Sequence, residues 1–207
     1  MSQGVLLVSA VRQDGLREVV GIAVADTESE ATYHELFRSL KARGLRGVEL
    51  VISDDHEGLK AAITRHFQGA SWQRCQVHYA RNLLGMVGPA KRKELASDLR
   101  AIFFAATSRE QALGIALAVA EKWRSEKGAT TKVACNLEEH IEECLSCLAF
   151  PEGHRRRIRT TNGLERFDQE IKRRTRVVRI FPNGEAPPRL VTALAIEQWE
   201  EWVTGRR

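Results

Sequence analysis

The segment VISDDHEGLKAAITRHFQGASWQRCQVHYARN, residues 51–82, gives the strongest indication of the fold. An apolar run ends in two carboxylates, Asp54 and Asp55, and a helix-forming stretch follows at once. A buried strand that ends in this way places a carboxylate at the rim of a sheet, where α/β folds bind their ligands. The segment therefore predicts an α/β fold with a site at the end of this strand.

Strands and helices continue to alternate on either side of this segment. Two β-branched runs flank the turn signal Gln13-Asp14-Gly15, which is typical of an antiparallel hairpin. Ser29 can cap the helix that follows, and Gly44 can end it. The expected elements are strands over residues 5–11, 18–25, 48–53 and 72–77, a helix from Ser29 to Gly44 and a helix from residue 56.

Residues 78–151 have the pattern of helices only. Three apolar stripes follow the 3.6-residue period of a helix, which favours the core of a helical bundle over a cofactor site. Asn136 is expected to cap the third of these helices. A helix over residues 163–175, a Pro-rich loop over residues 181–190 and a last helix over residues 190–203 follow. The three stripes are Leu95, Leu99, Ile102 and Phe103; Leu113, Ala116, Leu117, Ala120 and Trp123; and Leu137, Ile141, Cys144, Leu145 and Leu148.

The composition predicts a soluble, intracellular protein with a packed core. Of the 207 residues, 43% are hydrophobic, which is ordinary for a globular protein. The sequence has no run of about 18 apolar residues, and its N-terminus lacks the basic start of a signal peptide. The four cysteines are therefore expected to be reduced thiols.

The positive charge is concentrated in residues 154–179. This segment has ten Lys and Arg residues against three acidic ones, a local balance of +7 on a chain with a net charge of +5. A basic stripe on an otherwise slightly acidic chain is typical of a protein that binds a polyanion, because neutralised phosphates release counterions. The charge alone fits a solvated helix face equally well.

Asp54, Asp55 and Glu165 are the carboxylates that could carry chemistry. Hard oxygen ligands beside a basic surface suit Mg²⁺ and a phosphodiester, because magnesium takes few protein carboxylates and completes its shell with water and phosphate. A structural interpretation stays open, in which Asp54 or Asp55 caps the next helix and Glu165 complements the dipole of its own helix.

Cys75 and His78 have the spacing of zinc ligands. Cys144 and Cys147 could in principle complete a tetrahedral site with them. Cys144, however, lies on an apolar helical stripe, where a free cysteine behaves as a small hydrophobe, so buried thiols are the favoured interpretation. His78 could instead orient a ligand near the carboxylates or contact a phosphate.

Four stretches together resemble the Mutator-type transposases of bacterial insertion sequences. They are RGLRGVELVISDDHEGLKAAI, WQRCQVHYARNLL, FPEGHRRRIRTTNGLERFDQEIKRRTRVVRIFPN and LAIEQWEEW. The resemblance implies an α/β fold with a ribonuclease H-like mixed sheet and an all-helical insertion before the last catalytic helix. It divides the chain into residues 1–77 and 154–207, which form the core, and residues 78–153, which form the insertion.

The resemblance also implies a triad of two aspartates and a glutamate that binds two divalent metal ions, Mg²⁺ or Mn²⁺. Asp54 matches the second aspartate and Glu165 matches the glutamate. Cys75 and His78 match the Cys-x-x-His signature of the family, whose role is less clear. The family's first aspartate precedes the hairpin, and neither Asp14 nor Asp26 replaces it, so the first strand is expected to be missing. The expected contacts to the DNA backbone are Arg155, Arg156, Arg159, Lys172, Arg173 and Arg174.

The function implied by the resemblance is metal-dependent cleavage and transfer of DNA strands, by a truncated copy of a transposase. The implied partners are transposon ends and target DNA, together with a second copy or a full-length transposase, in a cytoplasmic protein associated with the nucleoid. An alternative is an inactive remnant that binds DNA or another transposase.

Overall fold

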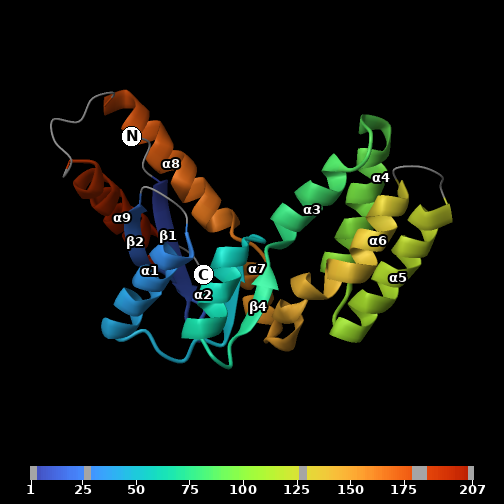
Figure 1. The fold of residues 1–207 in the computed structure, drawn as a ribbon, viewed down its shortest axis with the longest axis horizontal. Helices are drawn as coiled ribbons and strands as arrows, with labels where there is room; N and C mark the ends of the chain where they lie inside the picture. The colour runs from blue at the N-terminus through green and yellow to red at the C-terminus, as the bar shows by residue number, and fades with distance from the viewer. Residues whose placement is uncertain (1–3, 26–28, 126–129, 179–185, 205–207) are drawn as a thin grey trace. The chain divides into compact units, whose positions relative to one another are not determined.

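The chain folds into two compact units, each built from separate stretches of sequence. The computed structural model describes residues 4–25, 29–125, 130–178 and 186–204 (Figure 1). The first unit comprises Met1–Val48, Glu57–Gln68 and Thr161–Arg207, and the second comprises Glu49–His56 and Gly69–Thr160. The fold is mixed α/β and mostly helical, and its described strands form two two-stranded sheets.

The first unit combines a β hairpin with helices. The predicted hairpin is confirmed, because β1 (Gly4–Val11) and β2 (Arg17–Ala25) pair antiparallel around the predicted turn. The described helices of this unit are α1 (Glu30–Ala42), α2 (Glu57–His66), α8 (Asn162–Val178) and α9 (Ala186–Thr204). Residues 181–185 of the predicted Pro-rich loop lie outside the described residues, and so does Arg179 of the basic segment. Residues 186–190 are not a loop as predicted, because α9 already begins at Ala186.

A β-bulge aligns the hairpin with the core of the first unit. Val19 and Ile22 both pack against this core, although a spacing of three would put them on opposite faces of a regular strand. The pairing shifts between Val8 and Ser9 and leaves Val20 as an extra residue in β2, which restores the common face. The buried residues of this core are Phe167, Ile171, Val191, Leu194 and Ala195 from α8 and α9.

Helix α1 packs on the other face of the hairpin, at Gly21. A Cβ atom added at Gly21 would lie 2.8 Å from Leu40 Cδ2, so the glycine permits the close approach. Both predicted ends of α1 are confirmed. The Ser29 side chain accepts a hydrogen bond from the Thr32 N–H, and Gly44 follows the helix with a φ of +102°.

The second unit joins a short parallel sheet to a set of helices. Strands β3 (Leu50–Ser53) and β4 (Ser71–Arg74) pair in parallel. Strand β4 ends earlier than the predicted strand over residues 72–77, because α3 already begins at Gln76. The helices are α3 (Gln76–Gly85), α4 (Pro89–Arg100), α5 (Arg109–Ser125), α6 (Thr130–His140) and α7 (Glu152–Ile158), with the π-helix η1 (Ala101–Ala105) and the 3-10 helices η2 (Ile141–Cys144) and η3 (Ser146–Ala149).

Most of the predicted helical core is confirmed, with three corrections. The predicted third helix ends at His140, and Ile141, Cys144 and Leu148 of its stripe lie in the 3-10 helices η2 and η3. The first and third stripes are buried throughout, but Leu117 of the second stripe is 60% exposed. Asn136 does not cap a helix, because the apolar stripe extends back to Val133 and Ala134 and α6 begins at Thr130. None of the described helices is long and apolar enough to cross a membrane.

Gln73 of β4 links the sheet of the second unit to distant segments. Its side chain is fully buried. The amide Nε2 donates to the Ile158 carbonyl at 2.8 Å, and Oε1 accepts from the Cys147 N–H at 2.6 Å. One amide therefore satisfies a carbonyl at the end of α7 and an N–H in η3, both in the interior.

Replacing Gln73 with Leu is expected to lower the free energy of unfolding. Each backbone group left unpaired in the interior costs about 1–3 kcal/mol. Urea denaturation of Gln73→Leu, compared with the exposed control Gln169→Leu, measures the loss. Equal stability of the two variants would contradict the structural role of the buried amide.

Two histidines connect α1 and α2 in the first unit. His34 Nδ1 lies 2.8 Å from His66 Nε2, and His34 Nε2 lies 3.0 Å from Glu30 Oε1. Burial, followed by the charges of His34 and Lys41, lowers the pKa of His66 below its usual 6.5. The folded protein thus takes up a proton at His66 less readily than the unfolded chain does.

The contribution of His66 to the free energy of unfolding is expected to be fully present above about pH 6.5 and to decrease as the pH falls below that value. Melting temperatures of the wild type and His66→Gln at pH 7.5 and pH 5.5 test this. The melting temperature of the wild type should fall more between pH 7.5 and pH 5.5 than that of the variant. An equal loss in both proteins would show that His66 does not contribute to acid sensitivity.

Candidate metal-binding and nucleic-acid-binding residues

The two adjacent carboxylates after β3 have different surroundings. Asp55 Oδ2 lies 3.0 Å from Arg74 Nη1, and the Arg74 side chain is only 8% exposed. Asp54 is exposed, and its carboxylate has no hydrogen bond or ion pair within the described residues. Asp55 is therefore occupied by a structural ion pair, whereas Asp54 can accept a ligand.

Hydrogen bonds fix the backbone that carries Asp54. Ser53 is buried, and its hydroxyl donates to the Asp54 carbonyl at 2.7 Å and accepts from Trp72 Nε1 at 2.9 Å. The Cys75 N–H donates to the Ser53 carbonyl at 2.7 Å, which continues the parallel pairing beyond β4. The end of β3 is therefore a rigid position from which Asp54 projects.

Cys75 and His78 lie at the start of α3, directly after β4. Cys75 is fully buried, and His78 is half-buried one turn further along the helix. Cys75 is the N-cap residue of α3 and His78 lies in its first turn, so the thiol and the imidazole both belong to the start of this helix. The N–H of Gln76 donates to the Arg159 carbonyl at 3.2 Å, which anchors this helix start within the second unit.

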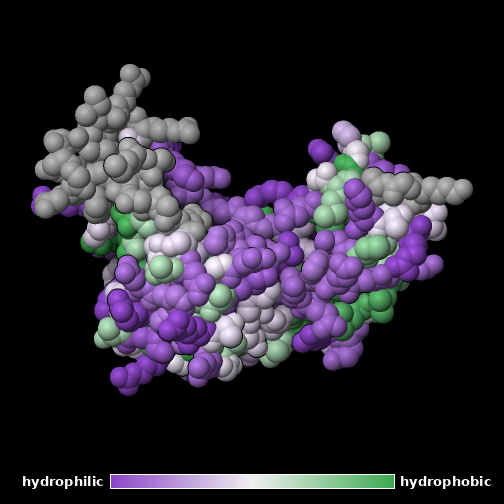
Figure 2. Space-filling model, viewed as in Figure 1, coloured by the Kyte–Doolittle hydropathy of each residue, from purple (hydrophilic) through white to green (hydrophobic). Residues whose placement is uncertain are grey.

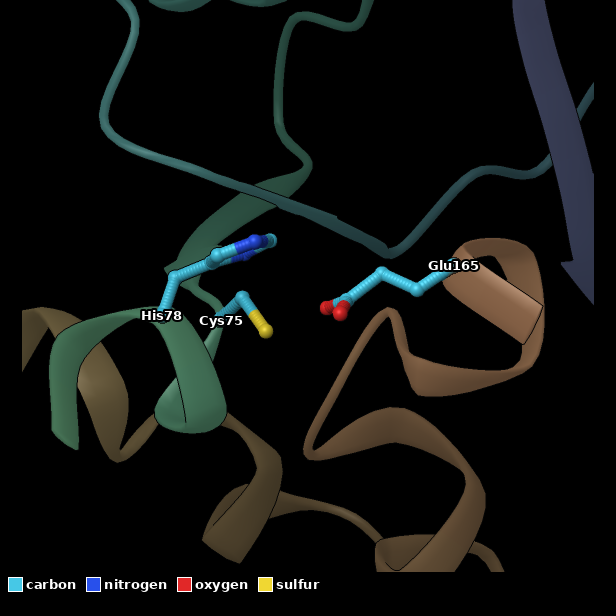
Figure 3. A group of neighbouring side chains, drawn as sticks. All are labelled: Cys75, His78 and Glu165. Carbon is cyan, nitrogen blue, oxygen red and sulfur yellow. The ribbon is translucent and has the colours of Figure 1, made fainter. Parts of the chain in front are cut away.

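Glu165 lies in the first turn of α8, in the first unit. Its N–H donates to the Thr161 carbonyl at 3.0 Å, and the Thr161 hydroxyl lies 3.4 Å from Oε1 of the half-buried carboxylate. Figure 3 draws the side chains of Cys75, His78 and Glu165, whose thiol, imidazole and carboxylate are all groups that hold metal ions.

The alternative of a four-ligand zinc site is not supported for Cys144 and Cys147. Both side chains are buried, and burial raises the pKa of each thiol. Within the part of the chain that the structure describes, neither belongs to a group of three close metal-ligand atoms. Buried thiols packed as small apolar side chains, the favoured interpretation from the sequence, fit these surroundings.

Two of the predicted DNA contacts already have partners inside the second unit. The Arg155 guanidinium donates to the carbonyls of Thr107, Leu148 and Phe150, at 2.8 to 2.9 Å. Arg159 donates to the Phe103 carbonyl. Arg156, between them in α7, is exposed.

The other predicted DNA contacts lie on the exposed side of α8, where Figure 2 shows a hydrophilic surface. Lys172 pairs with Asp168, and Glu170 accepts from both Arg173 and Arg174 at 2.7 to 2.8 Å. These two arginines lower the pKa of Glu170 to about 2. The cations of this face thus form ion pairs with acids of the same helix.

Comparison with known proteins gives one consistent family. A family model described as "Transposase, Mutator family" matches residues 1–205. The transposase for insertion sequence element IS406 of Burkholderia multivorans is 43% identical over 205 residues, which are 98% of this chain and 51% of that protein. The transposase for ISRM5 of Rhizobium meliloti is 40% identical over 207 residues, 100% of this chain and 51% of that protein.

A more distant relative shows the same coverage. The transposase for IS256 in transposon Tn4001 of Staphylococcus aureus is 34% identical over 212 residues, 100% of this chain and 52% of that protein. The chain spans about half the length of the curated relatives it matches.

The different surroundings of Asp54 and Asp55 predict different effects on stability. Asp55→Asn removes the charge that pairs with the nearly buried Arg74 and should cost about 1–2 kcal/mol. Asp54→Asn should change the free energy of unfolding by less than about 0.5 kcal/mol, because its carboxylate has no partner to lose. Denaturation of both variants by urea checks this order, and a larger loss for Asp54→Asn would reverse the assignment.

Proposed function

Because the chain belongs to the Mutator family of transposases, we propose that it serves metal-dependent cleavage and transfer of DNA strands, with Asp54 and Glu165 as metal ligands. The observation that carries the proposal is the exposed Asp54 carboxylate, which has no partner among the described residues, on a rigid strand end beside an ion-paired Asp55. A structural carboxylate would be expected to have the ion pair that Asp55 has.

The chemistry of the ligands fits magnesium or manganese. Carboxylate oxygens are the ligands that these ions prefer, and their remaining positions bind water and phosphate. Of two divalent ions held there, one would activate the attacking hydroxyl and the other would stabilise the leaving oxygen. Asp54 and Glu165 would be ligands of these ions, and His78 would orient a ligand or contact a phosphate beside them. Cys75 is buried and has a softer donor, so we propose that it packs rather than binds Mg²⁺.

We further propose a ribonuclease H-like core. Its support is the order of β1, β2, α1, β3, α2 and β4, followed by the helices of the second unit and then by α8 with Glu165. The resemblance assigns the first aspartate of the triad to a strand before the hairpin. A third carboxylate beyond Asp54 and Glu165 is therefore part of this proposal.

DNA is the proposed partner. The exposed cations of α8, Lys172, Arg173 and Arg174, together with Arg156 of α7, would contact phosphates and fix position rather than read sequence. Arg155 and Arg159 would contribute mainly by shaping the surface, since their guanidinium groups have backbone partners. We also propose a cytoplasmic, nucleoid-bound protein that assembles with a second copy or with a longer transposase.

A second candidate is a DNA-binding protein without cleavage activity. Its support is the exposed basic surface of Arg156, Lys172, Arg173 and Arg174, which needs no metal site to bind phosphates. Such a protein would retain DNA through its basic surface and would lose it steeply as salt rises.

Cleavage of a duplex that carries a transposon end distinguishes the two candidates. In Mg²⁺ or Mn²⁺ the wild type should nick the duplex, and Asp54→Asn and Glu165→Gln should each lower the rate by about 100-fold or more. Asp55→Asn is the matched control and should keep the activity at a temperature where it is folded. Salt-sensitive retention without nicking would favour the second candidate, and full activity of Asp54→Asn would refute the metal site.

A further inference from the structure

Phe104 is an exposed aromatic side chain on a π-helix of the second unit. It lies in η1, which continues α4 with a wider turn, and its side chain is 63% exposed. The preceding residues Ile102 and Phe103 are buried, so η1 anchors the segment on one side and presents Phe104 on the other. Single-turn π-helices are frequent at functional sites.

The Arg159 guanidinium covers one side of this ring. Arg159 Cζ lies 5.1 Å from the Phe104 ring centroid. The same guanidinium donates to the carbonyl of the neighbouring Phe103, and the Arg159 carbonyl accepts from the Gln76 N–H. Arg159 is therefore held at the ring by two hydrogen bonds, one from its guanidinium and one to its backbone carbonyl.

Arg155 fixes the same segment from one turn earlier in α7. It donates to the Thr107 carbonyl, three residues after Phe104. Arg155 and Arg159 are four residues apart and thus lie on one face of α7. Their hydrogen bonds to the carbonyls of Thr107 and Phe103 attach both ends of residues 103–107 to this face. Two further arginines are exposed on the flanking helices, Arg100 at the end of α4 and Arg156 in α7.

We propose that Phe104, backed by Arg159, is a stacking site for an unpaired nucleobase. An accessible π face beside cations is the arrangement with which proteins bind single-stranded nucleic acid, because the ring stacks on a base while the cations neutralise the phosphates. A contact with an apolar protein surface would not require the guanidinium of Arg159 at the ring. The proposal rests on the DNA-binding function proposed above and adds that the second unit takes single-stranded segments of that DNA.

Binding of two probes without divalent metal tests the proposal: a single-stranded oligonucleotide containing 2-aminopurine, and a blunt duplex of the same sequence. Phe104→Ala should bind the single strand about 5- to 100-fold more weakly, the range expected for loss of one stacked base. Its affinity for the duplex should be unchanged, and the quenching of 2-aminopurine fluorescence should be lost.

Two variants separate stacking from other effects. Phe104→Leu keeps an apolar side chain without a π face and should behave like Phe104→Ala, whereas Phe104→Trp should retain binding. Leu117→Ala is the matched control, because Leu117 is 60% exposed in the same unit and lies on α5. An equal effect of Phe104→Ala on both probes, or no effect on either, would overturn the stacking site. Failure of the wild type to bind either probe would refute the proposed DNA-binding function itself.

Discussion

The buried amide of Gln73 is the contact on which the second unit most depends. It joins β4 to η3 and to the end of α7, segments that are 74 and 85 residues away in the sequence. The same strand is followed by Cys75 and His78, and the end of α7 provides Arg159, whose carbonyl receives the N–H of Gln76. One polar side chain thus sets the positions of the helix start and of the arginines around it.

Local features of the fold were predictable because neighbouring residues determine them. The turn at Gly15, the cap at Ser29 and the apolar period of the helices all act within a few residues. The bulge at Val20 was not predictable in this way, since it depends on how the hairpin packs against α8 and α9. The early start of α6 was missed because Asn136 resembles a cap, although buried Val133 shows that the apolar stripe begins before it.

At the candidate site, too, the sequence indicated which residues matter but not the contacts that they make with distant parts of the chain. The family resemblance assigns the role of ligand to Asp54 and Glu165, but no sequence pattern shows that Asp55 forms an ion pair, because its partner Arg74 lies across the sheet. Likewise, an arginine-rich segment does not reveal which of its members are used internally. Arg155 takes three carbonyls that lie 5 to 48 residues away, whereas Arg156 next to it is exposed.

The hydrogen bond from Arg43 to the hairpin bears on whether β2 can pair with a strand of another molecule. Arg43 Nη1 donates to the carbonyl of Val20, the extra residue of the bulge, at 3.0 Å. A charged side chain at a bulge is a common way for proteins to prevent a strand edge from pairing with another molecule. The Arg43 guanidinium thus occupies this carbonyl, which is then not open to an N–H of another strand, at the point where the bulge already interrupts the regular ladder.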